Sequence, residues 1–119
     1  MGLGGPWAEV EFCVFDLETT GLKPEQGAEP IEVAGVRIVR GQIEDSFQAL
    51  VAPRGRIPRN VQELTGIRPD DVEDARSASE VLGDFLDFAG EAVLVAHNID
   101  FDRGFLDIYA PRPVDNNEI

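Results

Sequence analysis

The sequence predicts a mixed α/β fold in which three strands are followed by a helix, a fourth strand and a second helix. Residues Val10 to Leu17 form an apolar run typical of a buried strand. Ser77-Ala78-Ser79-Glu80 has the residues of a capping box, which begins a helix. Ala92 to Ala96 is a short apolar run after that helix. The helix that begins near Ser77 would cross over from one side of the sheet to this fourth strand, so we expect the fourth strand to lie parallel to the first.

Two further strands are expected between the first strand and the helix. Ile31 to Val39 is apolar on both faces and predicts a second strand that turns at Arg40-Gly41. From Ile43 to Val51 a mostly apolar set of residues alternates with polar ones, which suits an antiparallel hairpin. An irregular stretch with three prolines follows, and we expect one short helical turn in it, near Val61 to Leu64.

Both predicted helices have recognisable ends. The first, after Ser77, is expected to end at Gly90. The second is expected to run to Tyr109, with Asp100 as its N-cap. The first helix carries an apolar stripe made of Val81, Leu82, Phe85, Leu86 and Ala89.

Composition and charge limit the possible functions. The 119 residues are 43% hydrophobic, which predicts one globular domain with a modest core. The 23 acidic and 10 basic residues give a net charge of −13, which argues against a stand-alone nucleic-acid clamp. Cys13 is the single cysteine, so we expect a reducing, cytoplasmic environment. Residues 1–7 do not resemble a secretory signal, and no membrane-spanning stretch is expected.

Paired carboxylates follow the first predicted strand. Asp16 and Glu18 are two residues apart, so their side chains point the same way from a strand. Carboxylate oxygens are ligands that suit magnesium and manganese. The segment from His97 to Leu106 repeats the sequence of apolar strand, polar exit and acidic helix start, and it can supply a third carboxylate.

These segments resemble the DnaQ-like (DEDD) 3′-5′ exonucleases, the family of the proofreading subunit of bacterial DNA polymerase III. Phe15 to Leu22 resembles the first exonuclease motif and His97 to Leu106 the second. Ile31 to Val36 and Leu64 to Ile67 resemble the family's second strand and the segment that borders the nucleotide. The resemblance implies a ribonuclease H-like fold and hydrolysis of phosphodiester bonds at nucleic-acid 3′ ends.

The resemblance also implies a two-metal site with Mg²⁺ or Mn²⁺. Asp16 would bridge both ions, Glu18 would bind the ion that activates water, and Asp102 would support the second ion. Asp100 competes with Asp102, but the family pattern Asn-x-x-Phe-Asp selects Asp102. The implied substrate is a single-stranded 3′ end, with DNA favoured over RNA. The parent protein could assist a DNA polymerase or be fused to a helicase.

Residues that border the terminal nucleotide follow from the same resemblance. An ordinary turn explains Thr19, Gly21 and Leu22 about as well as contact with a nucleotide does. Core packing explains Phe101 at least as well. Arg54, Arg56, Arg59 and Arg68 cluster in this acidic chain, either to meet phosphates or to keep a loop soluble. The expected substrate-binding residues are Thr19, Gly21, Leu22, Asn60, Thr65 and Phe101.

The family places a fourth aspartate and a histidine base on a helix beyond the second motif, and we find neither in these 119 residues. Pro113-Val114-Asp115 resembles the start of the strand that leads to that helix. We therefore expect residues 1–119 to be a single, incomplete exonuclease domain with weak metal affinity and poor activity. Apolar residues of the helix after Ser77 would then stay exposed, which favours self-association or loose packing.

His97 and Asp102 fit the His-x-x-x-x-Asp spacing of the missing motif, but His97 ends a strand. We expect it to be a structural residue that is hydrogen-bonded to a neighbouring loop rather than the base. An alternative function remains open. The chain could be a catalytically dead remnant that acts as a nucleic-acid-binding or protein-interaction module.

Overall fold

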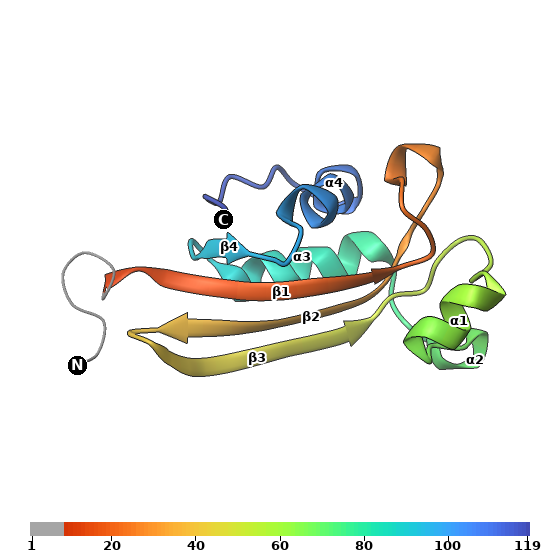
Figure 1. Cartoon of the computed structure of the whole chain (residues 1–119), viewed down its shortest axis with the longest axis horizontal. Coiled ribbons are helices and arrows are strands. Elements are labelled where there is room, and N and C mark those ends of the chain that lie inside the picture. The colour runs from red at the N-terminus through yellow and green to blue at the C-terminus, as the bar shows by residue number, and fades with distance from the viewer. Residues whose placement is uncertain (1–8) are drawn as a thin grey trace.

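The computed structural model describes residues 9–119. It has one mixed sheet in the order β3-β2-β1-β4, with β1 antiparallel to β2, β2 antiparallel to β3 and β1 parallel to β4 (Figure 1). This confirms the predicted α/β fold and the parallel fourth strand. The strands are β1 (Glu11–Thr19), β2 (Pro30–Val39), β3 (Gln42–Leu50) and β4 (Val93–Val95). The helices are η2 (Pro24–Gln26), α1 (Arg59–Thr65), α2 (Pro69–Val72), α3 (Ala78–Ala89) and α4 (Ile99–Tyr109).

The β2–β3 hairpin turns where the sequence predicts it. Val39 pairs with Gln42, which leaves a two-residue turn, and Arg40 and Gly41 both have positive φ, 53° and 77°. Two consecutive positive φ angles are what a type I′ turn requires, and this turn matches the right-handed twist of the strands.

The main core lies between one face of the sheet and helices α3 and α4. Phe15 packs against Phe85 with ring centroids 5.1 Å apart. A Cβ atom added at Gly35 would lie 3.2 Å from the Phe85 ring, so the ring needs this glycine. All five residues of the predicted apolar stripe of α3 are buried. The expectation that they stay exposed is wrong, because β2, β3 and α4 pack against this helix.

The two long helices begin with different caps. The Ser77 hydroxyl oxygen accepts the Glu80 N–H (3.3 Å), and the hydroxyl donates to the Glu80 carboxylate (3.0 Å). At α4 the cap is Asn98, whose side-chain oxygen accepts the Phe101 N–H (3.4 Å), and not Asp100. Asp100 lies inside the first turn, where its negative charge still suits the helix dipole.

The proline-containing stretch is more regular than the sequence predicts. The short helix α1 was expected, but α2 was not. Pro69 occupies its first turn, and the Asp71 carboxylate accepts the Arg68 N–H (2.8 Å). These two helices cover a second, smaller core of Ile31, Ile57, Val61, Ile67 and Val72.

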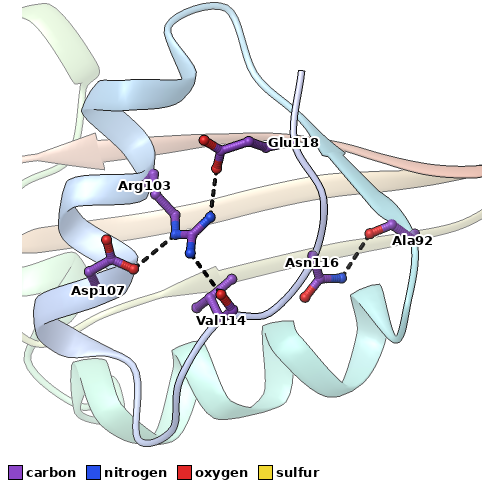
Figure 2. Close-up of polar contacts among 6 residues, drawn as sticks. All are labelled: Ala92, Arg103, Asp107, Val114, Asn116 and Glu118. Atoms are coloured by element: carbon purple, nitrogen blue, oxygen red, sulfur yellow. Dashed lines mark hydrogen bonds and ion pairs between the residues drawn. The ribbon is translucent and has the colours of Figure 1, made fainter.

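The C-terminal segment lies along the outer edge of β4. Leu94 donates its N–H to the Asn117 carbonyl and accepts the Ile119 N–H, both at 2.8 Å. Figure 2 shows the side chains that hold this segment: Arg103 donates to Asp107, Glu118 and the Val114 carbonyl. Pairing with β4 therefore occurs at Leu94 and Glu118, and not at 113–115, where the sequence suggested the next strand.

Among residues 9–119, no helix covers the other face of the sheet (Figure 1). Val14 is 37% exposed there, and a shallow hollow of about 460 Å³ lies over the residues around it. Among residues 9–119 no helix is long and apolar enough to cross a membrane. Residues 1–7, whose sequence does not resemble a secretory signal, lie outside the described residues.

Candidate active site

Strand β1 positions the first two candidate ligands. Phe15 and Leu17 point into the core, so Asp16 and Glu18, which alternate with them, lie on the opposite face near the end of the strand. Asp16 is exposed and Glu18 is half-buried. Partial burial, the charge of Asp16, a hydrogen bond with Asp16 and the charge of Glu32 together raise the pKa of Glu18. The structure therefore brings Asp16 and Glu18 together.

Asp102 reaches the same strand from helix α4. It is 3% exposed, and its Oδ1 accepts the Leu17 N–H at 3.3 Å. Burial, followed by the charge of Asp16, raises its pKa to about 6, although the hydrogen bond from Leu17 lowers it. Glu18 adds a smaller effect in the same direction as Asp16. Asp102 thus lies in the electrostatic field of both other carboxylates, as members of one acidic centre would.

The acidic centre has no cationic side chain to balance it. None of the ion pairs among residues 9–119 includes Asp16, Glu18 or Asp102. In the same part of the chain, no three acidic, histidine or cysteine side chains are grouped as ligands of one ion. Asp102 is instead directed at the Leu17 N–H. Unbalanced hard oxygen donors nevertheless fit the chemistry of a divalent cation.

The first three expected substrate residues lie at the last position of β1 and in the loop after it. Thr19 donates its hydroxyl to the Gly21 carbonyl (2.7 Å), which closes the turn. A Cβ atom at Gly21 would lie 3.3 Å from the Ala28 Cβ, so the two sides of the loop approach closely here. Leu22 is 79% exposed. Residues 20–23 and 26–28 line a hollow of about 490 Å³, with Gly21 and Leu22 among them.

Residues that were not predicted from the sequence hold this loop. Tyr109 of α4 donates its hydroxyl to the Ala28 carbonyl (2.6 Å). The Glu29 carboxylate accepts the N–H groups of Arg54 (2.7 Å) and Gly55 (2.8 Å). No local pattern signals these contacts, because Tyr109 lies 81 residues from Ala28 and Glu29 lies 25 residues from Arg54.

Of the other expected substrate residues, Thr65 and Phe101 have local structural contacts. Thr65 donates to the Val61 carbonyl (2.8 Å) and accepts the Ile67 N–H (3.1 Å), so its hydroxyl serves the end of α1. Asn60 is exposed on α1. Phe101 packs against Phe105 with ring centroids 5.0 Å apart, on the margin of the main core.

His97 lies in the turn between β4 and α4 and is exposed. It has no hydrogen bond to another described residue. The expectation that a neighbouring loop holds it is therefore wrong, because β4 ends at Val95 and His97 has already turned toward solvent.

Comparison with known proteins identifies the family. The family model described as "Exonuclease" matches residues 13–115, which is most of the chain. The chain belongs to this exonuclease family. It is 43% identical over 103 residues to a DNA polymerase III PolC-type of Thermotoga maritima, with 87% of this chain covered.

Solved exonuclease structures share the fold. Exonuclease X in complex with 5′ overhanging duplex DNA has a TM-score of 0.73 and 28% identity, covering 91% of this chain and 58% of the other. The nuclease domain of 3′hExo, a DEDDh family member bound to rAMP, has a TM-score of 0.72 and 28% identity, covering 85% and 58%. The ribonuclease H-like fold is thus confirmed. The chain spans 8% of the Thermotoga polymerase and 58% of each solved chain.

Proposed function

We propose that this exonuclease-family chain is a single domain that removes nucleotides from single-stranded 3′ ends, DNA in preference to RNA, and contributes to proofreading or repair. The observation that carries the proposal is the acidic centre, in which Asp102 reaches the strand that presents Asp16 and Glu18. The relatives support it, since one is a DNA polymerase III and one structure is a complex with DNA.

We further propose that the centre holds two Mg²⁺ or Mn²⁺ ions. When bound, the ions would activate a water molecule and stabilise the leaving 3′ oxygen. Asp16 would help to hold both ions, Glu18 would help to hold the ion that activates water, and Asp102, which now accepts the Leu17 N–H, would help to hold the other. Thr19, Gly21 and Leu22 would border the terminal nucleotide from the loop that Tyr109 and Glu29 hold.

The physiological setting is part of the same proposal. A DNA polymerase in the cytoplasm is the partner that the polymerase III relatives favour, and a fused helicase is the other candidate. The 119 residues offer no base in the position that the family uses. A general base is typically worth about 10²- to 10⁴-fold in rate, so we expect slow hydrolysis by this chain alone.

The test is release of mononucleotides from a 3′-labelled oligonucleotide. We expect weak, metal-dependent release by the 119-residue chain and none by Asp16→Ala. A chain extended through a segment that supplies the histidine and the fourth aspartate should be much faster. Robust release by the 119-residue chain would contradict the expectation that it lacks a general base, and His97 would then be the candidate for that role. An inert extended chain would instead support the binding or interaction module.

A further inference from the structure

The basic residues of this chain divide into two groups. Each arginine in the first group forms an ion pair of 3.2 Å or shorter: Arg37, Arg76, Arg103 and Arg112. The second group consists of Lys23, Arg40, Arg54, Arg56, Arg59 and Arg68. Within residues 9–119, the one ion pair formed by this second group joins Arg59 Nε to Glu63 Oε1 at 3.9 Å, and both side chains are largely exposed. An exposed pair of this kind contributes little.

The cations of the second group are concentrated at one end of the molecule. Arg40 lies in the β2–β3 turn. The others lie at the opposite end of the sheet (Figure 1). Lys23 follows β1, and Arg54 and Arg56 follow β3. Arg59 is the first residue of α1, and Arg68 directly precedes α2. Strand β1 leads to that end as well, past Asp16 and Glu18. Solvation alone would not require arginines without a close ion pair to gather there.

The loop after β3 that carries Arg54 and Arg56 is held in place beside the loop that follows β1. The Glu29 carboxylate accepts both the Arg54 and the Gly55 N–H, which joins the two loops. Arg54 is also close enough to Tyr109 for its charge to lower the pKa of that hydroxyl, against the raising effects of burial and Glu29. The backbone that carries Arg54 is therefore fixed next to the loop proposed to border the terminal nucleotide.

A second pair of arginines shares a hollow. Arg59 and Arg68 both line a hollow of about 370 Å³, together with Glu63. Two guanidinium groups on one concave surface suit a phosphate, which arginine can bind through two parallel hydrogen bonds. Glu63 opposes this charge. Arg56 likewise lines a hollow of about 580 Å³ with Asp70 and Glu73.

We propose that Lys23, Arg54, Arg56, Arg59 and Arg68 bind the backbone phosphates of the single strand whose 3′ end reaches Asp16 and Glu18. This inference rests on the proposed function and names the surface that binds its substrate. A chain with a net charge of −13 repels a polyanion at long range, so binding requires local cations that are not neutralised by a close internal ion pair.

The experiment measures binding of a fluorescein-labelled oligothymidylate by fluorescence anisotropy over a series of KCl concentrations. Every protein carries Asp16→Asn, so that hydrolysis does not interfere. We expect each of Arg54→Gln, Arg56→Gln, Arg59→Gln and Arg68→Gln to weaken binding and to reduce the slope of log affinity against log salt by about 0.7 per lost phosphate contact. Arg40→Gln is the matched control, and it should change neither quantity. Glu63→Gln should strengthen binding.

The outcomes separate this inference from the proposed function, because hydrolysis is measured in parallel with Asp16 restored. Binding that depends on these arginines, without hydrolysis, would support the surface and contradict the exonuclease proposal. The inference would be overturned if the protein hydrolyses the strand but the slope of log affinity against log salt is the same in all four arginine variants as in Arg40→Gln. The exonuclease proposal would then still stand. Absence of binding even at the lowest salt would also overturn it.

Discussion

Replacing Asp102 with asparagine should stabilise the apo protein at neutral pH. Asp102 is buried beside Asp16 and Glu18, and its carboxylate has one backbone hydrogen bond and no cationic partner among the described residues. Asparagine has nearly the same shape, and its side-chain oxygen can still accept the Leu17 N–H. The substitution therefore removes a buried charge while it keeps the contact between α4 and β1.

The pKa of Asp102 gives the size and the sign of the effect. It rises from 3.8 to about 6 in the folded protein. Below the unfolded value both states bind the proton, so the carboxyl group costs no stability. As pH rises toward 6, the unfolded chain loses its proton first and the free energy of unfolding falls. The full loss, reached above pH 6, is about 3 kcal/mol, since one pKa unit corresponds to about 1.4 kcal/mol.

The assay is urea denaturation followed by circular dichroism across the acidic to neutral range, with a chelator present. Asp102→Asn should match the parent chain at the acidic end and exceed it at neutral pH. Asp100→Asn is the control, because it removes an exposed charge from the same helical turn. Mg²⁺ should then stabilise the parent chain more than Asp102→Asn. A difference between the two proteins that does not vary with pH would refute the reasoning.

Three further predictions concern packing and assembly. Phe85→Ala, in the centre of the main core, should lower the free energy of unfolding by about 3 to 5 kcal/mol, and a loss near zero would contradict the packing of Phe85 against Phe15. Tyr109→Phe removes the bond to the Ala28 carbonyl, so hydrogen exchange of residues 20–28 should speed up while β2 and β3 stay protected; uniform protection would show that the hydroxyl does not hold the loop. Sedimentation should show concentration-dependent self-association through the uncovered sheet face, which Val14→Lys should abolish, whereas a parent chain that is monomeric at all concentrations would exclude this interface.

Much of the fold could be predicted because its signals are local. The hairpin depends on two residues at Arg40-Gly41, and α3 depends on Ser77 and an apolar stripe with helical spacing. The cap of α4 was misassigned for a related reason, since Asn98 and Asp100 are both good capping residues and only the backbone geometry decides between them. The short helix α2 has too few residues for a periodic pattern.

The site was less predictable, because its energetics depend on distant contacts. The period of a strand places Asp16 and Glu18 on one face, and this needs only the sequence. The burial of Asp102 depends on how α4 crosses β1, and its bond to Leu17 joins residues 85 positions apart. The division of the arginines into paired and unpaired groups likewise depends on tertiary contacts, such as that between Arg112 and Asp87.

The acidic centre and the core of this protein act in opposite directions on stability. Burial and the neighbouring carboxylates raise the pKa of Asp102, so its ionisation at neutral pH opposes folding, in a position that is otherwise surrounded by the core. Phe105 and Leu106, three and four residues further along the same helix, are completely buried and hold α4 against the sheet in spite of that cost. A sequence selected for stability alone would not retain this arrangement, since local rules are broken mainly at functional sites. The conflict between charge and burial at Asp102 is therefore itself an argument that the acidic centre serves a function, and a bound cation would relieve it.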